Sequence, residues 1–206
     1  MENVHSKQFI LYQIFFIFIL PVVLLYFKII PDGFRIFALM FCCLMIYGII
    51  RYEKWTLKDL GLADERVHKE IIPYIIVTIG GLLLILFLAK IFHKSPLQGF
   101  GPNMKLILTF IPISFLQEFA FRGFLMPMLK KVFSDTVTIV LLNSVLFTLM
   151  HIIYPGAGVV LPLSFIAGIG FSLMYHHYPN LILISISHSV LNFVAVLFGF
   201  FYIPHI

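Results

Sequence analysis

Apolar residues along this chain gather into seven long runs that are separated by short polar stretches. Each run approaches the ~20 residues that a helix needs to cross a hydrocarbon core of ~30 Å. Inside lipid, backbone N–H and C=O groups must bond within their own segment, so runs of this length predict helices. The predicted membrane-spanning helices cover residues 8–30, 34–50, 71–92, 105–129, 136–153, 159–175 and 180–201.

The longest polar interruption is the segment 51–70, which carries five basic and five acidic residues and predicts a hydrophilic loop. Over the whole chain of 206 residues, 61% are hydrophobic and only 11% are charged. In soluble domains about 45–50% of the residues are apolar and about 25% are charged. This composition excludes a soluble globular enzyme, a disordered tail and a disulfide-rich secreted module. With no internal repeat and no second composition block, the chain predicts one all-α, polytopic membrane domain over residues 1–206, a bundle of about seven helices.

The basic residues change this picture little. The net charge is +5, but the 14 Lys and Arg residues are scattered rather than clustered. Contact with anionic lipid headgroups therefore explains them better than nucleic acid does. With a cytoplasmic N-terminus, eight of them fall inside and five outside, which favours that orientation by the positive-inside rule. The adjacent Cys42 and Cys43 lie within an apolar run and predict inert packing residues.

Candidate chemistry begins at Glu118, a carboxylate in the middle of the fourth predicted helix. A charged side chain there costs at least ~2.5–3.5 kcal/mol on insertion scales, so it predicts a partner and an inward orientation. Arg122 lies four residues on, on the same helical face. A purely structural ion pair and a catalytic pair explain these two residues equally well.

Two histidines extend the set. His151 lies near the end of the fifth predicted helix, and His188 lies in the seventh, where Asn192 shares its face. A single histidine inside a membrane is more often a helix contact than a catalytic group, but three helices that contribute such groups at one depth are less accidental. An imidazole accepts a proton or binds a metal, and an amide donates a hydrogen bond to an oxyanion.

Three motifs in register carry a family resemblance. QEFAFRGFL at 117–125, FTLMH at 147–151 and HSVLN at 188–192 resemble the EExxxR, FxxxH and HxxxN pattern of the CPBP family of intramembrane proteases. That family comprises CAAX prenyl endopeptidases and bacteriocin-processing or immunity proteins. The segment WTLKDLGL at 55–62 is similar to a short loop that these proteins often place before their catalytic half.

The resemblance implies a bundle that encloses a polar, water-filled cavity, with a catalytic-type half at about 104–203. It implies an endopeptidase in the cell membrane that acts on a membrane-associated or lipid-modified peptide. A motif-one carboxylate and His151 would activate water, while His188 and Asn192 would hold the oxyanion. The same donors could instead hold Zn²⁺ or another divalent metal, with Glu118, His151, His188 and Asn192 as candidate ligands. The choice between a metal and a glutamate mechanism stays open.

The chain departs from the family pattern at Gln117, where the first motif has its first glutamate. An amide cannot take a proton from water. Glu118 is adjacent, but successive helical residues point about 100° apart, so it reaches the same place only if the helix is distorted. Three explanations stay open: a natural pseudoprotease, an engineered inactive variant, or an enzyme that recruits Glu118. The alternative function is a catalytically impaired scaffold, immunity or regulatory membrane protein.

Overall fold

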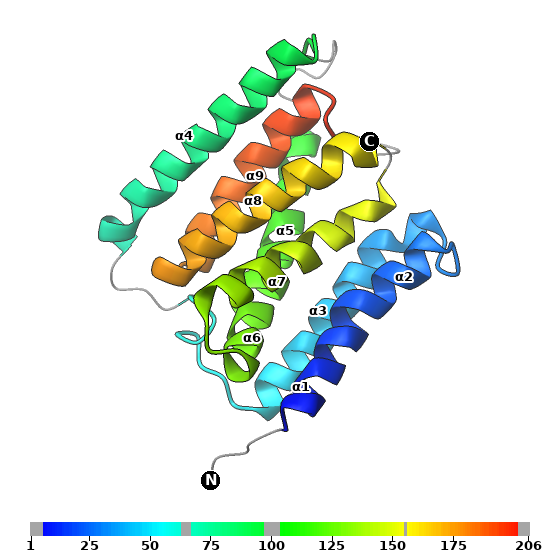
Figure 1. The fold of residues 1–206 in the computed structure, drawn as a ribbon, viewed down its shortest axis with the longest axis vertical. Coiled ribbons are helices and arrows are strands. Elements are labelled where there is room, and N and C mark those ends of the chain that lie inside the picture. Colours follow the sequence, from blue (N-terminus) through cyan, green and yellow to red (C-terminus); the bar gives the residue numbers. More distant parts are fainter. Residues whose placement is uncertain (1–5, 63–66, 97–103, 155, 202–206) are drawn as a thin grey trace.

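The computed structural model describes residues 6–62, 67–96, 104–154 and 156–201, and their side chains except those of 67–69 and 104–109. Within these ranges the chain is helical and contains no strand, which confirms the predicted all-α bundle. In Figure 1 helices α1–α3 form one edge of the molecule, α4 forms the opposite edge, and α5–α9 lie between them. The elements are α1 (Lys7–Ile14), η1 (Phe15–Ile19), α2 (Leu20–Tyr26), η2 (Asp32–Phe34), α3 (Arg35–Tyr52), α4 (Val67–Ile91), α5 (Met104–Glu118), η3 (Phe119–Leu125), α6 (Met126–Val132), α7 (Thr136–Leu149), η4 (Met150–Ile153), α8 (Ala157–His177) and α9 (Leu181–Leu197).

Five helical segments of the described chain are long and apolar enough to cross a membrane. They correspond to the first, second, third, fifth and sixth predicted spans. The fourth predicted span is the continuous α5–η3–α6 run, which carries buried charges, and the seventh is the shorter apolar helix α9. The chain is therefore a polytopic helical membrane protein, with five of the seven expected spans meeting the length and hydropathy test.

Several predicted boundaries need correction. The first helix ends at Tyr26 rather than at residue 30, because Lys28 adopts a left-handed backbone conformation with φ 59°. The last helix ends at Leu197 rather than at 201, because Gly199, with φ 64°, turns the chain back on itself. The predicted loop at 51–70 is shorter, since α4 already begins at Val67.

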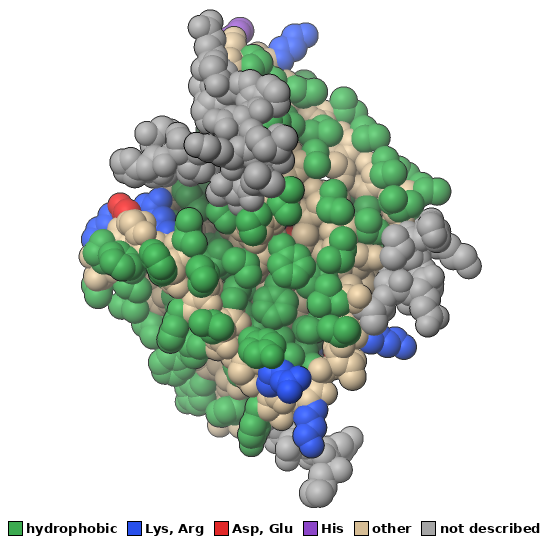
Figure 2. All heavy atoms as spheres, turned by 180° about the vertical axis from the view of Figure 1, so that it is seen from behind, with side chains coloured by type: hydrophobic (Ala, Val, Ile, Leu, Met, Phe, Trp, Pro, Cys, Tyr) green, Lys and Arg blue, Asp and Glu red, His purple; other side chains and the backbone are tan. Residues whose placement is uncertain are grey.

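The five crossing helices expose apolar side chains outward, as lipid requires. Large hydrophobic residues that would be unusual on a soluble surface are exposed along α3 and α4, among them Phe37, Phe41, Ile76, Leu83 and Phe87. Figure 2 shows a broad hydrophobic face with lysine and arginine side chains toward its margins. Charge at the margins and apolar atoms between them are typical of a membrane-embedded surface.

Two π-helical segments interrupt the helices, and each ends two residues before a proline. The segment η1 ends at Ile19, ahead of Pro21, and η3 ends at Leu125, ahead of Pro127. Proline has no N–H for the carbonyl four residues earlier, so the helix around it has to accommodate a missing hydrogen bond. The wider turn that results changes the direction of the side chains on η3, which carries part of the first motif.

The central core forms where α5–η3–α6 crosses α7, α8 and α9. Helix α7 packs along α8, and α9 packs between α5 and α4. At the α7–α8 crossing, a Cβ added to Gly168 would lie 3.1 Å from Cα of Ser144, so this close approach depends on glycine. Asp135 caps α7 by accepting a hydrogen bond of 2.7 Å from the N–H of Thr138, which also holds the pKa of this carboxyl below its usual range.

The WTLKDLGL segment closes one end of the bundle. Trp55 stacks on Phe124 of η3 with ring centroids 5.6 Å apart, and its Nε1 donates to Glu53 at 2.8 Å. The carbonyl of Gly61 accepts a 2.9 Å hydrogen bond from the N–H of Leu181, the first residue of α9. This loop therefore fixes the ends of two helices that carry motif residues.

We predict that Gly61→Ala destabilises the protein. Gly61 has φ +64°, and an added Cβ would lie 2.5 Å from the Tyr175 hydroxyl oxygen. The left-handed conformation alone costs an alanine about 1–2 kcal/mol, to which the displacement of Tyr175 adds. Thermal unfolding of the protein in detergent measures the effect. Gly48→Ala, where a Cβ meets nothing within 4 Å, is the matched control and should leave the unfolding midpoint unchanged or raise it.

Candidate functional site

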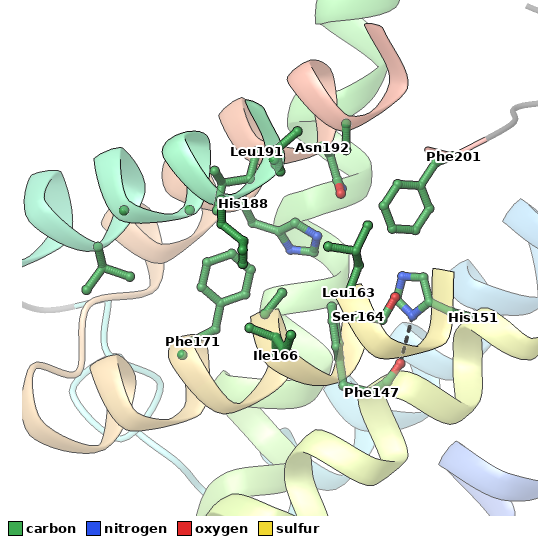
Figure 3. A pocket seen from close by; sticks show the side chains of 18 residues that line it. Phe147, His151, Leu163, Ser164, Ile166, Phe171, His188, Leu191, Asn192 and Phe201 are labelled. Atoms are coloured by element: carbon green, nitrogen blue, oxygen red, sulfur yellow. Dashed lines mark hydrogen bonds between the residues drawn. The ribbon is translucent and has the colours of Figure 1, made fainter. Parts of the chain in front are cut away.

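One cavity in the described part of the chain brings together three of the residues predicted for the site. It has a volume of about 270 Å³ and is bounded by α4, α7, η4, α8 and α9. His151, His188 and Asn192 line it, and Figure 3 shows the two imidazoles and the Asn192 amide pointing into the same space. Apart from these groups and one serine, the wall is apolar. The polar side chains are thus concentrated at one place in an otherwise hydrophobic cavity.

His151 is held by its own helix turn. Its Nδ1 lies 2.8 Å from the carbonyl oxygen of Phe147, which can only accept a hydrogen bond. Nδ1 must therefore carry the proton, and the lone pair of Nε2 is left for the cavity. The 3₁₀ turn η4, over Met150–Ile153, places this residue at the end of α7, where the side chain is 5% exposed.

His188 is anchored by a carboxylate instead of a carbonyl. Its Nδ1 lies 2.6 Å from Oε1 of Glu118, which is fully buried behind it and does not line the cavity. A carboxylate accepts this hydrogen bond, so Nδ1 again carries a proton and Nε2 faces away from the anchor. In both histidines, therefore, a hydrogen bond holds Nδ1, and Nε2 remains available for other contacts.

Arg122 completes the buried charge cluster. Its Nη1 donates to the same Oε1 of Glu118 at 3.1 Å, and its Nη2 donates to the carbonyl of Gly168 at 3.2 Å. The guanidinium carbon lies 4.4 Å from the ring centroid of Phe147 and 5.5 Å from that of Phe171. The cation is fully buried, and these contacts replace part of the water that it lacks, while its Nε has no hydrogen-bond partner.

Gln117 lies apart from this cluster. It lines a second cavity of about 110 Å³, between the motif helix and helices α2 and α3, and it does not line the first. The residue is 6% exposed, and its Oε1 has no hydrogen-bond partner. Of the two adjacent motif-one residues, it is Glu118 that contacts His188, with the π-helical turn η3 beginning at the next residue.

Asn192 follows His188 by one helical turn. Its Nδ2 is 3.4 Å from the Ser114 hydroxyl, a long hydrogen bond that leaves the amide free to reorient toward a ligand.

Sequence reasoning missed two groups, Phe147 and Ser164. The Phe147 ring centroid lies 4.9 Å from that of His151 and 5.6 Å from that of His188, so one ring supports both imidazoles. The F of the FTLMH motif was the available signal for it. Ser164 on α8 lines the cavity, and nothing in the sequence distinguishes it from the other serines.

The donor set does not fit a tightly held metal ion. Among the described residues there is no group of three His, Cys, Asp or Glu side chains arranged to bind one. His151 and His188 reach the cavity, but Glu118 stands behind His188 and uses Oε1 for both Arg122 and that histidine. Catalytic zinc sites usually take three protein ligands.

Comparison with known proteins is consistent with this arrangement. Residues 100–194 match the family model described as type II CAAX prenyl endopeptidase Rce1-like. The matched region contains all three motifs and confirms the family resemblance that they predicted. No curated protein and no solved structure matches the chain.

We predict that Arg122→Met is strongly destabilising. It leaves the Glu118 carboxylate buried without its cation, and removing one partner of a buried pair typically costs about 3–5 kcal/mol. The double variant Glu118→Gln/Arg122→Met removes both charges and should recover part of the loss, which a double-mutant cycle on thermal unfolding in detergent measures. Additive effects of the two single changes would contradict the pairing.

Proposed function

Residues 100–194 match the Rce1-like family model, which supports membership of the CPBP family of intramembrane proteases, and on that premise we propose that the protein hydrolyses a peptide bond in a membrane-associated or lipid-modified peptide. One observation carries the proposal. His151 and His188 come from different helices to line one cavity, each with Nδ1 anchored and Nε2 free. Two structural histidines would have no reason to present unpaired nitrogens to the same chamber.

His151 serves as the general base in this mechanism. Its Nε2 takes a proton from a water molecule as the water oxygen attacks the scissile carbonyl carbon. The C–N bond then breaks, and the same imidazolium returns the proton to the departing amine nitrogen. The hydrogen bond from Nδ1 to the Phe147 carbonyl fixes the ring through both steps.

His188 and Asn192 hold the oxyanion that forms on the carbonyl oxygen. The Asn192 amide donates a hydrogen bond, and a protonated His188 donates another from Nε2 while its charge is balanced by Glu118. Glu118 therefore acts as a positioning residue, and Gln117 takes no part in proton transfer. This proposal assigns the motif-one carboxylate to the oxyanion side of the site and, of the three explanations for Gln117, favours a working enzyme.

The cavity favours a substrate that arrives from the membrane. Its wall is formed by side chains such as Leu84, Ile85 and Leu163, with the small residues Gly80 and Gly170 leaving space. Such a chamber accepts an apolar peptide segment in preference to a polar one. We place the protein in the cell membrane with its N-terminus in the cytoplasm, in contact with anionic lipid.

Cleavage of membrane-tethered and CAAX-type reporter peptides by the purified protein tests the function. Loss of the base in His151→Ala should reduce kcat by about 10²–10⁴-fold. Glu118→Gln should reduce it by about 10–100-fold, the typical effect of removing a group that orients a catalytic histidine. Gln117→Ala, in the neighbouring cavity, should retain the wild-type rate within a few-fold.

Two outcomes would contradict this assignment. If cleavage appears only in Gln117→Glu, the chain is a disarmed protease, and the scaffold, immunity or regulatory function takes precedence. If His151→Ala and His188→Ala cleave as wild type does while remaining folded, the site is not catalytic at all.

A chelator provides a separate test. Because the donor set does not fit a metal, cleavage should continue unchanged in the presence of EDTA or 1,10-phenanthroline. Loss of cleavage on chelation, with recovery on added Zn²⁺, would overturn this part of the mechanism and return Glu118, His151, His188 and Asn192 to the role of ligands.

A further inference from the structure

One serine in the catalytic cavity has a hydroxyl group that nothing in the fold explains. Ser164 is 2% exposed, lies on α8 and lines the same cavity as His151, His188 and Asn192. Its Oγ has no hydrogen-bond partner. In Figure 3 the side chain lies on the His151 side of the cavity.

The other buried serines of the described chain are all satisfied. In a helix, a serine hydroxyl commonly donates to the carbonyl four residues earlier. Three serines do so here, at 2.6–2.8 Å, and the remaining three pair with side chains. The bonded hydroxyls belong to Ser144, Ser185 and Ser189, which donate to Val140, Leu181 and Ser185, and to Ser114, Ser172 and Ser187, which pair with Asn192, Asn143 and Thr78.

An unpaired hydroxyl in an apolar interior is a cost to the folded state. Ser164 could avoid it by donating to the carbonyl of Val160, as the other helical serines do to theirs, yet its Oγ stays unpaired at the cavity wall. An unpaired buried hydroxyl at the wall of a cavity is typical of a binding position, where the ligand provides the missing partner.

We propose that Ser164 is a substrate-binding residue that hydrogen-bonds to the peptide backbone next to the scissile bond; this rests on the proposed protease function. A peptide inside an apolar chamber has N–H and C=O groups that water no longer solvates. His151, His188 and Asn192 are committed to the reacting water and the oxyanion. Around Ser164 the α8 wall is otherwise apolar, with Leu163, Ile166 and Ala167.

The peptide then lies between α8 and α9. Gly170 leaves room along the α8 wall, because a Cβ added there would meet nothing within 4 Å. Ser164 binds the backbone from α8, beside His151, while His188 and Asn192 act from α9. Since this contact exists in the bound ground state as well as in the transition state, its loss should appear mainly in KM.

Ser164→Ala tests the proposal, with Ser172→Ala as the matched control on the same helix. Loss of one backbone hydrogen bond should raise KM for a cleaved reporter about tenfold and leave kcat within about twofold. In the His151→Ala background, where turnover is blocked, Ser164→Ala should weaken the Kd for a fluorescent CAAX-type reporter peptide in lipid nanodiscs by the same factor. Ser172 lies outside the cavity, so Ser172→Ala should change neither constant.

Thermal unfolding separates binding from structure. Ser164→Ala removes an unpaired hydroxyl and should keep or raise the unfolding midpoint. Ser172→Ala should lower it, because the buried Oδ1 of Asn143 loses a 3.0 Å hydrogen bond.

Two results would overturn the role of Ser164 alone. One is a lower unfolding midpoint for Ser164→Ala. The other is an unchanged KM and Kd for Ser164→Ala while His151→Ala and His188→Ala are inactive. Wild-type cleavage by both histidine variants, or no reporter binding in the His151→Ala background, would overturn the proposed function and this inference with it.

Discussion

The Glu118 carboxylate has to be stabilised in the interior of an apolar bundle, and much of the surrounding structure follows from that requirement. Its Oε1 accepts hydrogen bonds from Arg122 on η3 and from His188 on α9. The arginine in turn reaches the Gly168 carbonyl on α8 and the Phe147 ring on α7. Four helical segments therefore meet at one desolvated charge. The same contact orients His188, so the arrangement of the cavity lined by His151, His188 and Asn192 also depends on it.

A second constraint at the same place concerns the directions of the side chains along the motif helix. A regular helix would turn Gln117 and Glu118 about 100° apart and offer only one of them to the histidines. The π-helical turn η3 begins just after Glu118 and ends two residues before Pro127. Proline thus accounts for the irregular turn, which follows Glu118 and carries Arg122 within the same buried space as α9.

The sequence predicted the parts of this protein that depend on local composition. Apolar runs long enough to cross lipid identified the helices, and the fifth span was predicted at the observed limits, 136–153. The predicted ends of the first and last helices, at 30 and 201, were wrong, because left-handed residues end these helices at Tyr26 and Leu197 in spite of the apolar sequence that follows. The side to which Gln117 turns, and the unsatisfied hydroxyl of Ser164, depend on packing between helices distant in sequence, which no local pattern contains.

The same charge balance gives a reason for glutamine at position 117. Glu118 already draws on a buried arginine and a histidine, and Arg35, the cation that lines the Gln117 cavity, is paired with Asp32 at 2.8 Å. A second carboxylate at 117 would enter an apolar cavity without a cation of its own, at the cost of several kcal/mol that buried unpaired charges carry. A neutral amide avoids that cost and leaves Glu118, Arg122 and His188 unchanged. A glutamine at position 117 therefore keeps the fold stable while Glu118 makes the charged contact to His188.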